Sequence, residues 1–543
     1  MPSISPDGKF VAYTADAPNG RECIWIREVR TGHAAQLTPA DGFNYSAHGF
    51  SRDGNYVYIH KADLHNQSDY FLGDLYRVPI IGGTPFKIAA NVGGGIDTAP
   101  DDSRLVFVRP DLVNKENHLI VINADGTGEH VIATRKWPDI SWVTSWSPDA
   151  RLIAFCARSR EGDKFYNTVM AVPAEGGPEF PLTKSHWLDV GGALWLPDGT
   201  GLLITAHDQA SDPFQIYSIS YPGGEVQRVT NDVNSYSALG ITADGKTVVG
   251  EMADVSSNIW ILPNGDSARA RQITYGGKDG VGGLAWTPDG RIIYATISRD
   301  GYSGTGASGG KALWTADAAG SNPERLTSGE EIDAHPGVTP DGRYVVFSSY
   351  QNGAWGIWRV DIDGHNPKQL AGGGTMTSPS CSPDSRWVVF RSGPLAAQRV
   401  WRVSIEGGEA VKLSDRQAYA PSVSPDGKLV AFFSAGETKK NLVLIPATGG
   451  EPVKVFDNSP DTRYLLFTEV VRWTADGRLL TYIDNIGEVS NIWGEPIEGG
   501  AAQQLTKFDT GTIFSFAWSK DGRQLAVARG QYNRQIVLIE DLG

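Results

Sequence analysis

Residues 424–432 read Ser-Pro-Asp-Gly-Lys-Leu-Val-Ala-Phe, a tight turn followed by an alternating apolar run, and this stretch decides the fold. Proline at the second turn position presets φ, aspartate hydrogen-bonds nearby backbone, and glycine accepts a positive φ. The run after the turn has the period of two that is typical of a strand. The stretch therefore predicts a turn that joins two antiparallel strands.

The same tetrapeptide, S/T-P-D-G with substitutions, recurs twelve times along the 543 residues. All copies keep the aspartate and nine keep the glycine. Intervals between copies run from 42 to 52 residues, in or near the range of one propeller blade. The copies start at residues 5, 51, 99, 147, 196, 242, 287, 339, 382, 424, 474 and 519.

Two more strands are predicted after each copy. The third carries tryptophan between branched residues, as at 259–261 and 357–360, and commonly ends in a Gly-Gly or Asp-Gly turn. The fourth ends in Leu-Thr, as at 36–38 and 504–506. Four strands repeated radially make propeller blades, because one blade cannot bury both of its faces. We therefore predict an all-β fold, a β-propeller of twelve four-stranded blades.

The blades are expected to form two six-bladed rings in tandem, residues 1–270 and 271–543, because side chains fill the central axis of a six-bladed ring better than that of a twelve-bladed ring. One larger ring is the alternative. The segment 271–274 either completes the sixth blade locally or opens the second ring and pairs with the twelfth blade. We favour the second reading, because a single strand upstream of residue 1 then completes both rings and leaves no open edge.

Composition and charge disfavour several classes of protein. The net charge is -14, the pI is about 5.2, and no Lys/Arg-rich run exists, so nucleic acid is not an expected partner. No apolar run approaches the roughly 18–20 residues that cross a bilayer, so no membrane insertion by this chain is expected. Cys23, Cys156 and Cys381 are far apart and lack a CxxC spacing, which argues against a disulfide framework or a zinc site.

Short segments resemble two motifs, one nucleotide-binding and one catalytic, but the first lacks the required context and the second is incomplete. Residues 304–309 match G-x-G-x-x-G, but a strand rather than a phosphate-binding helix is predicted to follow, so we interpret them as a loop. Residues 49–53 and 301–305 fail the last place of G-x-S-x-G. The ten histidines are single, although histidines from separate blades could still assemble a metal site. No catalytic residue, cofactor or metal is predicted.

Candidate binding residues occur in the loops that join the fourth strand of one blade to the first strand of the next. These loops should share one ring face near the axial opening, and loops on a rigid scaffold commonly carry binding. A merely solvated rim is the alternative. The polar and aromatic residues there are Trp137, Asp139, His186, Trp187, Asp189, Tyr236, Asp333 and His335. The third-strand tryptophans, by contrast, recur once per blade and are expected to pack between blades.

The turn, the Ile-Trp-x-Val strand and the Leu-Thr strand together resemble the TolB-like family of WD-like propeller repeats. Segments 76–85, 123–136 and 514–542 are also similar to the C-terminal propeller region of bacterial receptor-like serine/threonine kinases and of related winged-helix regulators. That resemblance implies an extracytoplasmic or periplasmic sensor part of a larger signalling protein. The chain lacks the kinase motifs themselves, so kinase activity is not implied.

Our leading functional hypothesis is a non-catalytic sensor or scaffold that binds a protein, a peptide or a small ligand on a loop face. Two alternatives stay open. One is a TolB-type periplasmic adaptor, and the other is a propeller enzyme, a lyase or peptidase-associated, with a site at the axis.

Overall fold

The computed structural model describes most of the chain as strand. The described residues are 2–17, 22–41, 43–63, 72–111, 113–136, 140–161, 164–208, 213–232, 234–297, 310–328, 331–351, 354–393, 398–435, 440–456, 470–486 and 489–540. Over these ranges the one helical segment is a short 3-10 turn, Ser267–Arg269, and no helix there is long and apolar enough to span a membrane. The protein is all-β, as predicted.

One sheet shows the plan of the others. Strands β36 (Tyr419–Val423), β37 (Leu429–Ala435), β38 (Lys440–Pro446) and β39 (Lys454–Phe456) pair in chain order, and every pairing is antiparallel. The sheet is therefore a meander of the kind that forms a propeller blade.

The turn that opens this meander closes as its sequence predicts. The Gly427 N–H donates to the Ser424 carbonyl at 2.9 Å, and the Ser424 hydroxyl donates to Asp426 Oδ1 at 2.6 Å. The Ser424 hydroxyl also accepts from the Leu429 N–H at 2.9 Å. The same bond from hydroxyl to carboxylate is present in the turns at Asp7, Asp53, Asp149, Asp244, Asp289, Asp384, Asp476 and Asp521.

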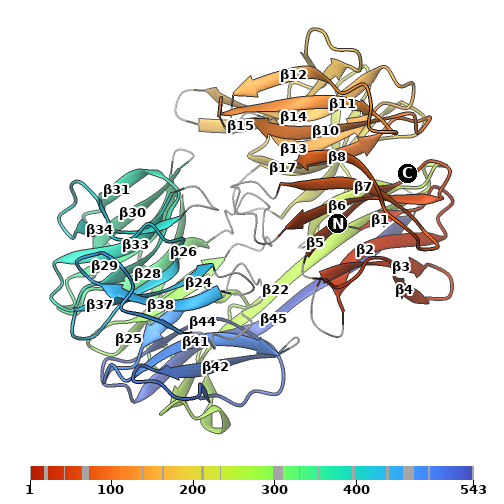
Figure 1. Cartoon of the computed structure of the whole chain (residues 1–543). Coiled ribbons are helices and arrows are strands. Elements are labelled where there is room, and N and C mark those ends of the chain that lie inside the picture. Colours follow the sequence, from red (N-terminus) through yellow and green to blue (C-terminus); the bar gives the residue numbers. More distant parts are fainter. Residues whose placement is uncertain are drawn as a thin grey trace. The chain divides into compact units, whose positions relative to one another are not determined.

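The chain divides into two compact units, and unit 1 comprises residues 1–253 and 534–543. It holds five sheets of four strands, each paired in chain order, and a further sheet that begins with β21 and β22 (Figure 1). The strands are β1 (Ser3–Ile4), β2 (Phe10–Asp16), β3 (Glu22–Glu28), β4 (Ala34–Gln36), β5 (Phe43–Phe50), β6 (Tyr56–Asp63), β7 (Gly73–Pro79), β8 (Phe86–Val92), β9 (Gly94–Thr98), β10 (Arg104–Asp111), β11 (Glu116–Asn123), β12 (His130–Lys136), β13 (Ile140–Trp146), β14 (Leu152–Glu161), β15 (Lys164–Pro173), β16 (Phe180–Pro181), β17 (Asp189–Trp195), β18 (Gly201–His207), β19 (Gln215–Ser220), β20 (Val226–Arg228), β21 (Ser235–Ile241) and β22 (Thr247–Pro263).

Unit 2 comprises residues 254–533 and follows the same plan. Besides β36 to β39 it contains four more sheets of four strands and the group of β44, β45, β22 and β23. The strands are β23 (Arg271–Gln272), β24 (Asp279–Trp286), β25 (Arg291–Ile297), β26 (Gly310–Asp317), β27 (Glu324–Arg325), β28 (Ile332–Val338), β29 (Tyr344–Gln351), β30 (Ala354–Asp361), β31 (Lys368–Gly374), β32 (Met376–Cys381), β33 (Trp387–Ser392), β34 (Arg399–Ser404), β35 (Val411–Lys412), β40 (Val471–Trp473), β41 (Leu479–Ile486), β42 (Val489–Pro496), β43 (Gln503–Gln504), β44 (Thr512–Trp518) and β45 (Gln524–Glu540).

Strands β22 and β45 are long, with 17 residues each, and both continue from one unit into the other. The sheet order is β21-β22-β45-β44, and β23 pairs with β22 at Trp260 and Ile261. In unit 2 the third strand beside β45 is therefore the second half of β22. In unit 1 the third strand beside β22 is the end of β45, whose Val537 and Ile539 pack near Leu203 and Val248.

This exchange of third strands corrects the expected division of the chain at residues 270 and 271. Residues 254–270 lie in unit 2, and residues 534–543 return to unit 1. The favoured pairing of segment 271–274 with the twelfth repeat is not found, because β23 pairs with β22 of the sixth repeat. The sheet that β23 joins through β22 also contains β44 and β45.

The core of each unit lies between neighbouring sheets. In unit 1, Val106 and Val108 of β10 cluster with Ile153 and Phe155 of β14 on the next sheet. The first strands contact one another in turn, and β1 contacts β21 to close the unit. Unit 2 closes in the same way between β24 and β44, where the Ser515 hydroxyl donates to the Gly280 carbonyl at 2.6 Å.

The third-strand tryptophans serve this packing, as expected. The indoles of Trp260, Trp314, Trp358, Trp401 and Trp493 lie partly buried against the hydrophobic clusters of unit 2.

Candidate functional site

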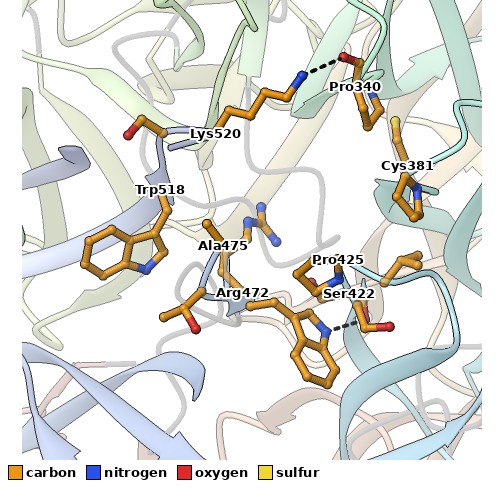
Figure 2. Close-up of a pocket in the computed structure, with 14 residues that line it drawn as sticks. Pro340, Cys381, Ser422, Pro425, Arg472, Ala475, Trp518 and Lys520 are labelled. Carbon is orange, nitrogen blue, oxygen red and sulfur yellow. Dashed lines mark hydrogen bonds between the residues drawn. The ribbon is translucent and has the colours of Figure 1, made fainter. Parts of the chain in front are cut away.

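The S/T-P-D-G turns of unit 2 surround an open cavity of about 260 Å³, which we call the turn-face pocket. Residues of five successive turns line it, from Pro340 after β28 to Lys520 after β44, and Figure 2 shows them around the opening. Five proline and tryptophan side chains form its walls. They are Pro340, Pro383, Pro425, Trp473 and Trp518.

Both indoles of the pocket are held in place by bonds to a neighbouring sheet. The Trp473 Nε1–H donates to the Ser422 carbonyl of β36 at 3.1 Å, the bond drawn in Figure 2. The Trp518 Nε1–H donates to Thr481 Oγ1 of β41 at 3.2 Å. The apolar walls are therefore fixed before any ligand arrives, which lowers the entropic cost of binding.

Two cationic side chains belong to the pocket. Arg472 lies in β40, and in Figure 2 its guanidinium lies towards the middle of the opening. Burial lowers the pKa of Arg472 to about 10, so the group stays protonated at neutral pH. Lys520 reaches from the turn after β44 to the Pro340 carbonyl, with an Nζ to O distance of 3.4 Å.

The backbone of Arg472 is well supported, whereas its side chain makes little use of its donors. The Thr481 hydroxyl donates to the Arg472 carbonyl at 2.9 Å. Nη1 of Arg472 donates to the carbonyl of the adjacent Val471 at 3.1 Å. A guanidinium has five N–H donors, so a ligand in the pocket could accept from the others.

The thiol of the pocket is not activated, and its described lining residues supply no carboxylate or imidazole. Burial raises the pKa of the Cys381 thiol to about 12, with Asp341 adding to the shift, so it is not a thiolate at neutral pH. The lining residues include no Asp, Glu or His. The arrangement is suited to holding a ligand.

The carboxylates of the adjacent turns are engaged elsewhere. Asp426, Asp476 and Asp521 each accept from the hydroxyl of their own turn. Each also lies 3.8–3.9 Å from a basic side chain two residues on, namely Lys428, Arg478 and Arg523. The guanidinium of Arg472 has none of these carboxylates as a partner.

The residues predicted from sequence were expected in the loops that join one sheet to the next, but four of them lie in first strands: Asp189 in β17, Tyr236 in β21, and Asp333 and His335 in β28. Trp137 and Asp139 lie outside the described residues. His186 is exposed, with Nδ1 2.8 Å from Thr168 Oγ1 and its ring centroid 4.3 Å from that of Tyr166. Trp187 is buried in a core cluster and exchanges backbone bonds with Asn167, so its role is structural.

The remaining two predicted residues of unit 1 are also partly or wholly covered. Burial raises the pKa of Asp189, against the opposing effect of His207, its partner across the strand pair of β17 and β18. The hydroxyl of buried Tyr236 donates to Asp232 Oδ2 at 2.7 Å. Each residue is engaged in its own local contacts, and a binding role for them stays a prediction.

In unit 2 the two predicted residues lie on β28, the first strand of its sheet. Asp333 is buried, its Oδ1 has no hydrogen-bond partner among the described residues, and burial raises its pKa. His335 has φ +53° just before Pro336, and its buried Nδ1 likewise lacks a partner among the described residues. Burial lowers the pKa of His335 to about 3, and Arg391 and Arg472 lower it further by repulsion. His335 is therefore neutral and lies near the arginine of the pocket.

Sequence reasoning missed Arg472, although the repeat contains a signal for it. The residue stands two places before the tetrapeptide that starts at 474. In the other eleven copies that place holds serine four times, glycine three times, alanine twice, leucine once and aspartate once. Nine of those eleven residues are small, so an arginine at this position is an exception that marks it as a candidate for binding.

Comparison with protein families gives one match, in unit 2. Residues 280–463 match the family model described as the TolB beta propeller domain. These residues are TolB-like propeller repeats. The segment includes half of the residues that line the turn-face pocket, from Pro340 to Pro425, whereas Arg472, Trp518 and Lys520 follow it.

Curated relatives share parts of the chain. An uncharacterized protein of Agrobacterium fabrum, Atu1656, is 28% identical over 275 residues, which cover 46% of this chain and 85% of that protein. The Tol-Pal system protein TolB of Xanthomonas campestris is 36% identical over 83 residues, 15% of this chain. This chain therefore spans only 17% of the length of that TolB.

Two solved structures align with parts of this chain at low identity. A putative TolB of Agrobacterium tumefaciens is 18% identical with a TM-score of 0.42, covering 51% of this chain and 98% of its own. TolB of Acinetobacter baumannii is 14% identical with a TM-score of 0.31, covering 74% and 80%. We draw no functional inference from likenesses at these scores.

Proposed function

We propose that this chain is a non-catalytic β-propeller module that binds a protein or peptide at the turn-face pocket of unit 2. The observation that carries the proposal is the pocket itself, an opening with walls of fixed proline and tryptophan side chains and a cation at its centre. Aromatic anchors and arginine are the residues that contribute most to protein interfaces. The inert thiol and the lack of lining acids or histidines favour binding over catalysis.

The blade arrangement is part of the proposal. Two rings of six blades, twelve in all, agree with the twelve copies of the turn and with the closing contacts of β1 with β21 and of β24 with β44. The sixth blade of unit 1 and the last blade of unit 2 would then exchange third strands through β22 and β45. Such an exchange would tie the two rings together covalently at two points.

The biological setting is proposed from similarity. A TolB-type adaptor is favoured by the TolB beta propeller domain match and by the segment that is 36% identical to TolB of the Tol-Pal system. A sensor part of a larger extracytoplasmic signalling protein is the other setting, implied by the resemblance to kinase-linked propellers. Both settings require a non-catalytic surface that binds another protein.

The experiment selects peptides from a random library on phage against the full chain and measures the enriched peptides by calorimetry. Ala475→Trp fills the pocket from an exposed turn position, so we expect it to abolish binding. Ala243→Trp is the matched control, because residues 242–245 of unit 1 have the same turn sequence, Thr-Ala-Asp-Gly, and should leave binding unchanged. Equal binding to the two variants, or no enriched peptide at all, would refute the proposal.

A further inference from the structure

Arg472 is an unusual residue for its place in the repeat. Its equivalents in the adjacent sheets are Ser422 and Ala517, so the neighbouring first strands present small groups where β40 presents a guanidinium. Burying a cation costs free energy unless it is paired. Among the described contacts, the guanidinium donates to the carbonyl of Val471, a neutral acceptor.

Unit 1 shows what a charge at this place does when it is structural. Asp97 is the equivalent residue there, and its carboxylate accepts from the Trp146 N–H at 2.6 Å and from the Thr98 N–H at 2.8 Å. Asp97 therefore joins two neighbouring sheets. Arg472 forms no such bond to a neighbouring sheet among the described contacts, and its head lies in the pocket instead.

The surroundings of Arg472 are suited to one small anionic group. Lys520 adds a second positive charge at the rim, and the turn carboxylates are bonded within their own turns. The volume of about 260 Å³ admits a side chain or a chain end rather than a folded surface. The acidic turns around the opening, in a chain of net charge -14, oppose a long polyanion.

We propose that the turn-face pocket of unit 2 is a carboxylate-binding site, in which Arg472 pairs with the carboxylate of a peptide ligand and the proline and tryptophan walls contact the adjoining apolar atoms. The planar guanidinium matches a carboxylate with two parallel N–H···O bonds. The Lys520 ammonium, now against the Pro340 carbonyl, lies at the rim of the same opening. This inference rests on the proposed function, because it names the group that the pocket recognises.

The test uses three small probes on the full chain, with affinity measured by ligand-observed NMR titration. N-acetylglutamate α-amide carries a side-chain carboxylate, and its isomer N-acetylglutamine carries a terminal one. N-acetylglutamine amide has the same shape without charge. At least one of the two acids should bind at least ten times more tightly than the neutral amide. Tighter binding of N-acetylglutamate α-amide would indicate that the pocket binds an acidic side chain, and tighter binding of N-acetylglutamine would indicate that it binds a chain end.

Variants connect that preference to Arg472. Arg472→Met keeps an unbranched side chain of similar length, and we expect it to weaken binding of the preferred acid at least tenfold. Arg478→Met is the matched control, because Arg478 is an exposed arginine in the turn between β40 and β41 that pairs with Asp476, and the substitution should leave the affinity unchanged. Should Arg472→Met fail to fold, Ala475→Trp in place of it must abolish binding of the acid.

Three results would overturn the inference. They are equal binding of the acids and the neutral amide, tighter binding of inorganic phosphate than of either acid, and unchanged affinity in both pocket variants. The proposed function fails separately. Library peptides that bind the pocket with no preference for a carboxylate would leave the proposed function intact and remove this inference alone, whereas the absence of any enriched peptide would remove the proposed function and this inference together.

Discussion

A glycine in the turn after a third strand tests the packing of one blade against the next. Gly126 lies between β11 and β12 with φ +86°, and a Cβ placed there would lie 2.8 Å from the Ile88 carbonyl oxygen of β8 on the preceding sheet. Gly82 has nearly the same conformation, φ +82°, in the corresponding turn between β7 and β8, and nothing lies within 4 Å of its Cβ position. The two positions differ in the contact alone.

The expected magnitudes follow from this difference. Alanine in the left-handed conformation costs about 1–2 kcal/mol at either position. At residue 126 the methyl group must also push the neighbouring backbone away, and overpacking of this kind costs at least about 1 kcal/mol more. Since 1 kcal/mol corresponds to about 2–4 °C in a domain of this size class, Gly126→Ala should melt about 2–4 °C or more below Gly82→Ala.

Differential scanning calorimetry of the full chain measures both variants against the unchanged protein. Equal shifts for Gly126→Ala and Gly82→Ala would refute the close approach of this turn to β8. The result bears on the whole fold, because a glycine of the turn after the third strand lies close to the preceding fourth strand in other sheets as well. The further residues are Gly224, Gly320, Gly364 and Gly449.

Two other predictions concern unit 1. The Lys9 ammonium, with the Ser5 hydroxyl, lowers the pKa of Asp7 from 3.8 to about 2. The stability that Asp7 contributes is therefore present above pH 3.8 and is lost as the pH falls through about 2. A carboxyl NMR titration should find a midpoint near 2 for Asp7, and Lys9→Met should move that midpoint towards 3.8. The third-strand exchange predicts that Val537→Ala, which removes methyl groups packed beside Val248, lowers the free energy of unfolding of unit 1 by roughly 1 kcal/mol, measured by denaturant titration. Leu538→Ala is its control, since Leu538 is exposed and should change little; equal effects of the two would contradict the assigned strand.

The candidate site shows how far sequence reasoning reached. The loops between blades were the natural place to look, because their residues vary and include aromatic and charged types. The pocket lies instead at the repeated turns, whose uniform sequence conceals that five of them meet around one opening. Of the predicted residues, none lines the pocket among the described residues, although the charge of Arg472 lowers the pKa of His335, and Trp187 is a core residue.

The plan of each blade could be read from the chain alone, because the interactions that create it are local. Turn residues, alternation along strands and hairpin glycines act over fewer than about ten residues, and the bonds of Ser424 and Asp426 form as their sequence predicts. The hydroxyl and the carboxylate are two residues apart, so no distant contact is needed to bring them together. All-β architecture and the four-stranded repeat follow from these signals.

Tertiary structure alone decided which third strand joins which sheet. It also decided which charged side chains come together at the turn-face pocket. The segments Ile259–Ile261 and Ile536–Ile539 have the same alternation, so either fits beside either second strand, and only the packing of Val537 and Ile539 in unit 1 distinguishes them. Lys520 and Pro340 likewise meet across 180 residues of chain. Local patterns cannot encode such partners, because strand pairing and convergence at an axis depend on surfaces that exist only once the sheets have packed.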